Sequence, residues 1–346
     1  TRSQKPANAG ISTLTNRPAE LSAVSPPCRA RSTPRMTQIS ADARWHRVLT
    51  LSDGRTLAFT DVGDPLGYPI VFGHGMPGSR LEGRFFDEKA REHGFRILTP
   101  DRPGIGNSDF QPGRKLLDYP ADIEQLADSL ELARFSHIGW SSGGSRTLAC
   151  CYRLADRVDL GVCLSGLTHF AEYPGSGGLV QATRWPGPQL VRLSPRLTRL
   201  AVTLIAWLSR RHPGLYLKGA EEMASRHDRQ LLRKLLSDGE FQRDQLMCLN
   251  SGGRAITTDL LTELGNWGFS LRDIRTPVFI YQGEEDPFVP MDYARHLAKN
   301  LPVAELTPMP GLGHLYPLCR DFQDQLFQRL TLQLDRHQTK ESQTPS

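Results

Sequence analysis

A serine in a glycine-rich segment is the first residue of this sequence that points to chemistry. Ser141 lies in a Gly-Trp-Ser-Ser-Gly segment, between a buried strand expected at residues 135–138 and a helix expected at residues 147–152. A Gly-x-Ser-x-Gly turn from strand to helix presents the serine hydroxyl as a nucleophile at the positive end of the helix. Gly139 and Gly143 are required because a β-carbon at either position would clash with the neighbouring element. Taken alone, the segment is also compatible with an ordinary glycine-rich connection.

A serine hydroxyl becomes a good nucleophile only when a base removes its proton. His314 is our candidate for this base. It lies in a Pro-Gly-Leu-Gly-His loop that follows a short strand expected at residues 304–307 and precedes a helix expected at residues 322–334. A loop after a strand is where a base is expected, and His314 comes last in the chain, as the order serine, acid, histidine requires.

The base needs a carboxylate that orients it, and Asp286 is the candidate acid. It follows the β-rich run at residues 277–281, in a Gly-x-x-Asp-x-x-Val-Pro spacing between a turn and the next helix. Glu284 and Glu285 are its neighbours and the alternative acids. Asp286 fits better because its spacing starts from the turn glycine and ends before the helix.

Acyl transfer also needs two backbone N–H groups that stabilise the developing oxyanion. One is expected from Ser142, which follows the nucleophile. The other is expected from the His-Gly-Met-Pro-Gly-Ser loop after the strand at residues 70–72. Pro77 has no N–H, so Met76 is the expected donor, and His74 is interpreted as a structural residue of this loop.

Five motifs in this order resemble the α/β-hydrolase superfamily over roughly residues 45–335. They are the segments that begin at His74, Asp101, Gly139, Gly283 and Gly313. The resemblance implies an α/β fold with a mostly parallel sheet flanked by helices, and a helical cap inserted between strands 6 and 7. It also implies Ser141 as nucleophile, Asp286 as acid and His314 as base, which is the assignment that the local patterns favour.

Differences between the branches of this superfamily narrow the chemistry. Epoxide hydrolases and haloalkane dehalogenases carry Asp where this chain has Ser141, so both are disfavoured. Proline iminopeptidases share the His-Gly-x-Pro-Gly loop but usually carry Gly-Gly-Ser-Trp-Gly at the nucleophile. The Gly-Trp-Ser-x-Gly-Gly form is closer to small-molecule esterases, cofactor-free haloperoxidases and carbon–carbon bond hydrolases.

We therefore expect a carboxylesterase-like serine hydrolase that cleaves a small or medium, apolar ester-like carbonyl substrate through an acyl-enzyme. The same triad could serve a peptidase resembling proline iminopeptidase, a thioesterase, a carbon–carbon hydrolase or a haloperoxidase-type reaction. An α/β-hydrolase fold that binds a ligand without turnover is the alternative from another class. No substrate-binding residue or oligomeric state is assigned, because the segment expected to form the cap has no recognisable motif.

Charge and cysteine content exclude several other classes. Residues 1–36 carry six basic side chains and one acidic, whereas the other 310 residues carry 36 of each. The body of the protein therefore has no net charge, and nucleic acid is not an expected partner. No apolar stretch reaches the roughly 20 residues of a membrane span. The six cysteines show no metal-ligand spacing, so we expect buried free thiols, a cytoplasmic location, and neither metal nor cofactor.

Composition also divides the chain. Residues 1–36 are rich in Ser, Thr, Pro and Arg and are expected to be a disordered tail. Met36 is the expected true start of the protein, with an organelle transit peptide as the alternative for the residues before it. The hydrolase core is expected at residues 37–167 and 267–338, the cap at 168–266, and a disordered C-terminus at 339–346.

One cap segment has apolar residues on more than one face of an expected helix, around residues 197–208. We expect this helix to be sandwiched between the core and other helices. The alternatives are that its inner face covers an apolar pocket, or that the arginines near its ends help it bind a membrane surface.

Overall fold

The residues that the computed structural model describes are 45–174, 191, 193–237 and 239–343. They belong to one compact unit, Thr33–Ser346. The tail expected at residues 1–36 lies outside the described residues, as do residues 344–346.

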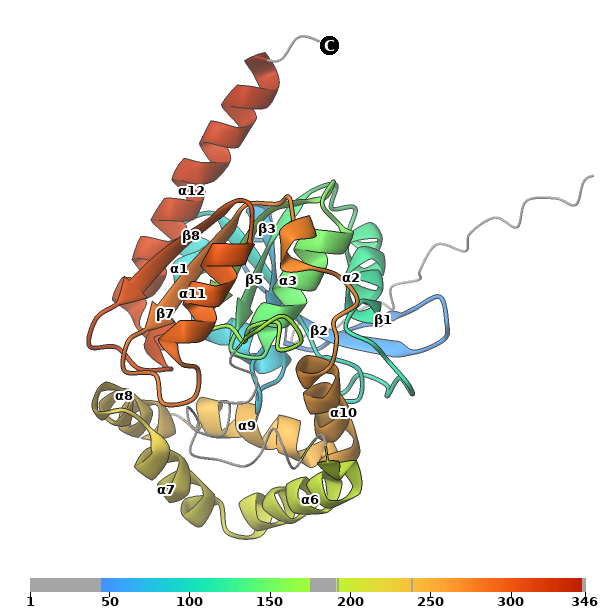
Figure 1. The fold of residues 1–346 in the computed structure, drawn as a ribbon, viewed down its shortest axis with the longest axis vertical. Helices are drawn as coiled ribbons and strands as arrows, with labels where there is room; N and C mark the ends of the chain where they lie inside the picture. Colours follow the sequence, from blue (N-terminus) through green and yellow to red (C-terminus); the bar gives the residue numbers. More distant parts are fainter. Residues whose placement is uncertain (1–44, 175–190, 192, 238, 344–346) are drawn as a thin grey trace, which may run out of the picture. The chain divides into compact units, whose positions relative to one another are not determined.

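Within the described residues, eight strands form one mostly parallel sheet (Figure 1). They are β1 (Arg47–Thr50), β2 (Thr56–Gly63), β3 (Tyr68–Gly73), β4 (Phe95–Pro100), β5 (Phe135–Trp140), β6 (Val158–Leu164), β7 (Val278–Gly283) and β8 (Ala304–Met309). Across the sheet their order is β1-β2-β4-β3-β5-β6-β7-β8. β2 pairs antiparallel with β1 and with β4, and the other neighbouring pairs are parallel. The predicted α/β fold is confirmed.

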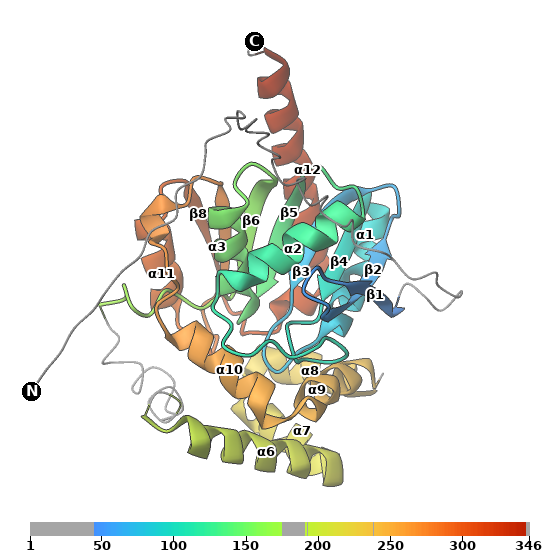
Figure 2. The same cartoon turned by 90° about the vertical axis from the view of Figure 1, so that its right-hand side faces the viewer.

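Helices cover both faces of the sheet, as a parallel sheet requires (Figures 1 and 2). One face packs against α2 (Asp118–Ser129), α3 (Gly143–Arg153) and α11 (Met291–Asn300). The other packs against α1 (Asp87–Glu92) and α12 (Arg320–Gln343). Every residue of β5 and β7 is buried, as expected for central strands with helices on both faces. β7 is a mostly apolar run, whereas β5 also buries Ser136 and His137.

Short 3₁₀ helices connect some of these elements. They are η2 (Arg80–Phe86), η3 (Leu271–Asp273) and η4 (Tyr316–Leu318).

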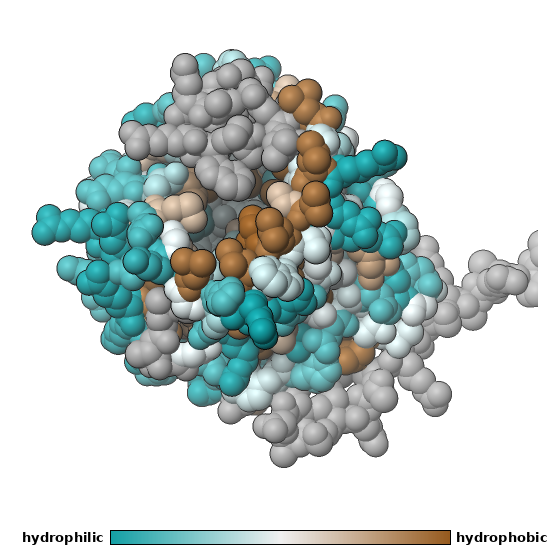
Figure 3. All heavy atoms as spheres, turned by 90° about the horizontal axis from the view of Figure 1, so that it is seen from below, coloured by the Kyte–Doolittle hydropathy of each residue, from teal (hydrophilic) through white to brown (hydrophobic). Residues whose placement is uncertain are grey.

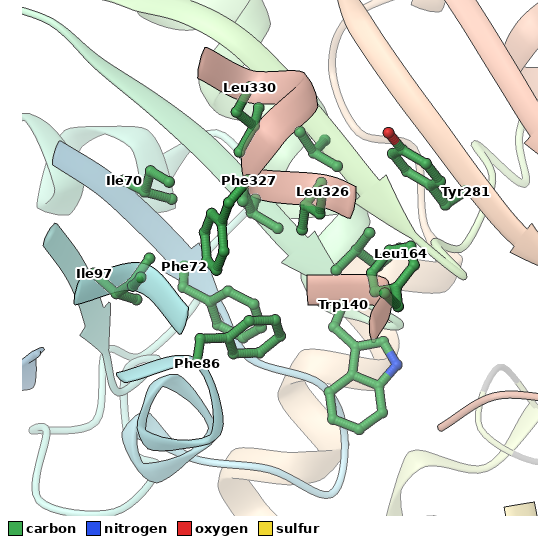
Figure 4. Packing of buried hydrophobic residues seen from close by; sticks show 14 of the residues in the cluster. Ile70, Phe72, Phe86, Ile97, Trp140, Leu164, Tyr281, Leu326, Phe327 and Leu330 are labelled. Atoms are coloured by element: carbon green, nitrogen blue, oxygen red, sulfur yellow. The ribbon is translucent and has the colours of Figure 1, made fainter. Parts of the chain in front are cut away.

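The core beneath α12 fixes the strand end that carries the candidate nucleophile. Phe72 of β3 lies beside Phe86 of η2, with ring centroids 5.0 Å apart, and Phe327 of α12 belongs to the same cluster (Figure 4). Trp140, the last residue of β5, also belongs to it. Burial of these large rings therefore holds in place the residue directly before Ser141.

The last helix is longer than the sequence predicted. We expected a helix at residues 322–334 and a disordered segment at 339–346, but α12 continues to Gln343. The prediction was wrong for residues 339–343. Residues 339–343 are all polar, and a segment without apolar periodicity gives no sequence signal that a helix continues through it.

Between β6 and β7, where the sequence predicted a helical cap, the chain forms helices that lie at one end of the sheet (Figure 1). They are α6 (Pro195–Arg211), α7 (Pro213–Met223), α8 (Arg226–Ser237), α9 (Glu240–Asn250) and α10 (Gly252–Leu264). We call α6–α10 the insertion.

Helix α6 is not sandwiched between other elements, so this expectation was wrong. Leu200 and Leu204 are 66% and 60% exposed, and apolar side chains form a band beside a hollow on the face of the molecule seen in Figure 3. The buried positions of α6 are instead small, Thr198, Ala206 and Ser209. Small side chains allow α6 to pack closely on α10, whereas Ile205 and Leu208 line a cavity and Leu200 and Leu204 stay exposed. No helix in the described segments is both long and apolar enough to cross a membrane.

A buried ion cluster joins the insertion to the core. Asp259 of α10 accepts hydrogen bonds from Arg102 and Arg114, each at 2.6 Å, and Arg146 of α3 lies 3.5 Å away. All four side chains are at most 5% exposed. Burial by itself would raise the pKa of Asp259, but the three guanidinium groups outweigh it and hold this pKa below its ordinary value.

We expect Asp259→Asn to lower the free energy of unfolding by about 3–5 kcal/mol, because it leaves buried guanidinium groups without a compensating charge. Urea unfolding followed by circular dichroism measures this loss. The matched control is Asp292→Asn, which removes an exposed carboxylate paired with Arg295 and should cost less than about 1 kcal/mol. Equal, small losses in both variants would contradict a structural role for the cluster.

Candidate active site

The turn between β5 and α3 holds Ser141 in a left-handed backbone conformation, with φ of +55°. Such a conformation is strained for a residue with a side chain and is typical of a serine exposed at a strand-to-helix turn. A β-carbon on Gly139 would lie 2.2 Å from the carbonyl oxygen of Gly143, and one on Gly143 would lie 1.9 Å from that of Gly73. The predicted steric need for both glycines is confirmed.

His314 and Asp286 meet directly. His314 Nδ1 lies 2.7 Å from Asp286 Oδ2, and the Asp286 side chain is 1% exposed. The other carboxylate oxygen of Asp286 accepts the N–H groups of Phe288 and Val289, each at 2.9 Å. Asp286 is therefore fixed by its own loop and can orient the imidazole ring. The alternative acids, Glu284 and Glu285, are both exposed.

The pair shifts the pKa values of both groups in the sense expected for an ion pair. Burial alone would lower the pKa of His314, but the charge and hydrogen bond of Asp286, together with the charge of Asp228, raise it above its ordinary value. Burial alone would raise the pKa of Asp286, but His314 and two backbone N–H groups lower it. A protonated His314 is therefore stabilised, as a base that accepts a proton during a reaction needs to be.

Ser141 and His314 line the same cavity, whose volume is about 440 Å³. With Nδ1 of His314 engaged by Asp286, Nε2 is the ring nitrogen left for a partner in the cavity. Most other side chains that line it are apolar, and they come from the core and the insertion: Met76, Trp140, Ile205, Leu208, Leu215, Tyr216, Met223, Leu232, Phe241, Phe288 and Leu315.

The loop after β3 supplies the backbone at another side of this cavity. Its Gly75 N–H donates to Glu82 at 2.8 Å, and its Ser79 N–H donates to Asp244 at 2.9 Å. Among the described residues, no hydrogen bond occupies the N–H of Met76 or of Ser142. These are the two groups that the sequence singled out, and Met76 lines the cavity.

His74 has the structural role that its position suggested. It is fully buried, its Nδ1 lies 3.0 Å from the carbonyl oxygen of Gly75, and its Nε2 accepts the N–H of Arg102 at 3.2 Å. Burial holds the pKa of His74 well below its ordinary value. A neutral imidazole with both nitrogens engaged stiffens the loop and does not transfer protons.

Two buried acids behind this loop escaped the sequence analysis. Glu82 lines the cavity, and Asp244 of α9 accepts from both the N–H and the hydroxyl of Ser79. Burial and the charge of Asp244 raise the pKa of Glu82 well above its ordinary value, and burial raises that of Asp244 to about 7. Nothing in the spacing around either acid indicates that it would be buried against a loop.

A third acid, Glu263 of α10, contacts the residues that follow the nucleophile. It accepts hydrogen bonds from the hydroxyl of Ser142, from that of Ser145 at 2.6 Å, and from Arg146. The insertion therefore holds the first turn of α3 through hydrogen bonds to Glu263. Within the described residues, no group of three or more His, Cys, Asp or Glu is arranged to hold a metal ion.

Comparison with known proteins places this geometry in a family context. Residues 68–318 match the protein family described as alpha/beta hydrolase fold. A non-heme chloroperoxidase of Streptomyces lividans is 39% identical over 101 residues, which cover 28% of this chain and 35% of that protein. A 2-hydroxy-6-oxononadienedioate/2-hydroxy-6-oxononatrienedioate hydrolase of Escherichia coli K12 is 23% identical over 285 residues, or 80% of this chain and 92% of that one.

Solved structures show the same fold. An esterase of Thermogutta terrifontis superposes with a TM-score of 0.60 at 19% sequence identity, and the match covers 84% of this chain and 98% of the esterase. At this identity the likeness concerns the fold.

We expect Asp286→Asn to lower the pKa of His314, because burial then acts without the carboxylate that outweighs it. Titration of the imidazole by nuclear magnetic resonance measures the change: the pKa of wild-type His314 should lie above 6.5 and fall in the variant. Glu284→Gln is the matched control and should leave it unchanged. A shift in the control but not in Asp286→Asn would assign the acid to Glu284.

Proposed function

The chain belongs to the alpha/beta hydrolase fold family, and we propose that within it this protein is a serine hydrolase of small or medium-sized apolar esters. The observation that carries the proposal is the mostly apolar cavity of about 440 Å³ that Ser141 and His314 share, with Asp286 bonded behind the imidazole. A cavity of this size accommodates a small molecule and not a folded polymer.

The reaction follows from the roles these residues can take. Ser141 attacks the carbonyl carbon while His314 takes its proton, and Asp286 holds the resulting imidazolium. The N–H groups of Met76 and Ser142 stabilise the oxyanion of the tetrahedral intermediate. His314 then returns the proton to the leaving alcohol, and a water molecule activated by His314 cleaves the acyl-enzyme.

The charges around the cavity favour an uncharged substrate. The ionisable side chains of the lining, among the described residues, are Tyr216, His314 and the acids Glu82 and Asp228. The relative from Escherichia coli acts, by its name, on a dioate, which carries two carboxylates. The carboxylate of Asp228 in this lining would repel such a substrate, so we favour ester cleavage over cleavage of a dicarboxylate.

A fluorophosphonate probe is expected to label wild-type protein at Ser141, because it reacts with a serine activated by a histidine. Peptide mapping by mass spectrometry identifies the labelled residue, and Ser141→Ala is the control that should stay unlabelled. Absence of labelling in correctly folded wild-type protein would refute the proposed nucleophile.

A panel of p-nitrophenyl esters, aminoacyl amides and acyl-CoA thioesters separates ester hydrolysis from peptidase and thioesterase chemistry. Turnover of the short and medium esters alone is the result expected here. Binding without turnover across the panel would instead favour a ligand-binding protein.

Replacement of the nucleophile and of the base should reveal that they act as one unit. With the best ester of the panel, Ser141→Ala is expected to lower kcat/KM at least about 1,000-fold, which corresponds to about 4 kcal/mol. His314→Ala should cost a similar factor, and the double variant little more than either one. Multiplied losses in the double variant would show that the two residues act independently.

A further inference from the structure

Helix α8 of the insertion contributes a buried carboxylate to the loop that carries His314. Asp228 Oδ2 accepts the backbone N–H of His314 at 2.6 Å, and its Oδ1 accepts that of Leu315 at 3.0 Å. Asp228 is fully buried. Ser225 Oγ in turn accepts the N–H of Asp228 at 3.1 Å, which fixes the start of α8. The carboxylate thus satisfies two buried N–H groups of a loop 86 residues further along the chain.

The opposite side of the same loop is held by the core. Trp140 Nε1 donates to the carbonyl oxygen of His314 at 3.1 Å. Trp140 is the residue before Ser141 and lies in the core cluster beneath α12. The backbone of His314 is therefore held at its N–H by the insertion and at its C=O by the strand that carries the nucleophile.

The contact between α8 and this loop leaves no spare room. A β-carbon on Gly313 would lie 2.0 Å from Asp228 Oδ2 and 2.2 Å from Ser225 Oγ. Since both are far shorter than a van der Waals contact, any side chain at this position would displace the side chains of Asp228 and Ser225 from the loop. The glycine before His314 is thus the residue that permits the insertion to approach.

We propose that Asp228 is a positioning residue, which fixes His314 beside Ser141 only while α8 is docked on the core. This inference rests on the proposed function, because it assigns His314 the part of the base. The insertion then supplies part of the reaction geometry in addition to the walls of the cavity. Displacement of α8 would leave two buried N–H groups unpaired and release the loop.

The charge of Asp228 adds an electrostatic effect to the positional one. The titratable groups that face His314 are Asp286 from the loop after β7, Asp228 from α8, and Glu82 of η2 across the shared cavity. The raised pKa of Glu82 favours its neutral form, so the two aspartates supply the negative charge. Asp228 is one of the groups that raise the pKa of His314. Loss of its charge should therefore move the deprotonation of His314 to lower pH, which a purely steric role would not do.

The test is the second-order rate of fluorophosphonate labelling as a function of pH, which needs no knowledge of the natural substrate. Labelling requires neutral His314, so the rate rises as this residue loses its proton. Asp228→Asn keeps the shape of the side chain but presents an NH₂ to one of the two N–H donors. We expect a loss of at least about tenfold in the maximal rate, the size of a lost hydrogen bond to a charged group, with the rise moved to lower pH.

The matched control is Glu221→Gln. It removes one carboxylate from the insertion at the ion pair with Arg233, which also involves α8. The labelling rate of this variant should stay within about twofold of wild type, because loss of an ion pair near the surface has a small effect. Its pH dependence should be unchanged. A wild-type rate and pH dependence in Asp228→Asn would overturn the inference while leaving the serine hydrolase proposal intact. Failure of wild type to react would refute both.

Gly313→Ala tests the same contact from the core side. It replaces Asp228→Asn as the test if circular dichroism shows that Asp228→Asn does not fold. Its methyl group should displace Asp228, lower the labelling rate by a similar factor and move the pH dependence in the same direction. A rate unaffected by this substitution would overturn the inference. If Asp228→Asn does fold, the double variant Asp228→Asn/Gly313→Ala should be labelled little more slowly than either single variant, because both substitutions break the same contact. A rate loss in the double variant equal to the product of the two single losses would also overturn the inference.

Discussion

The turn at Ser141 is the constraint to which the rest of the site conforms. Its backbone is held at a positive φ by the hydrogen bond from the Ser141 N–H to the carbonyl oxygen of Leu164, at 2.8 Å, and by the first turn of α3. A β-carbon on Gly139 would meet the backbone of Gly143, and one on Gly143 that of Gly73, so β5, α3 and the end of β3 approach one another too closely for side chains at these positions. A strained serine persists only when its surroundings over-determine it, and here sheet, helix and insertion all contribute.

The insertion contributes through carboxylates. Asp259 and Glu263 of α10 reach the arginines and serines behind the nucleophile, Asp244 of α9 reaches the loop after β3, and Asp228 of α8 reaches the loop of the histidine. Each of these acids accepts hydrogen bonds from buried groups of the core. The helices that wall the cavity are therefore attached to the core at the three loops where the proposed chemistry takes place.

The fold and the residues proposed for catalysis could be predicted because each one lies in a short segment whose shape depends on local sequence. Glycines at the turn of Ser141, the Gly-x-x-Asp spacing before Asp286 and the Gly-His pair at His314 are such segments. The acids of the insertion were missed for the opposite reason. Asp228 stands between basic and polar residues and looks like a solvated position, and its burial depends on a contact 86 residues away. The exposure of α6 was missed because apolar periodicity does not show which face meets a partner.

The close approach of Asp228 to Gly313 has a consequence for how hydrolases of this kind diversify. An insertion is often regarded as an exchangeable module that sets specificity while the core keeps the chemistry. Here an exchange of α6–α10 for the corresponding segment of another protein would also remove an acceptor for the histidine loop. A recombined enzyme on this core would need an acid at the third position of its own α8, and the glycine opposite, before new specificity could be expressed as turnover.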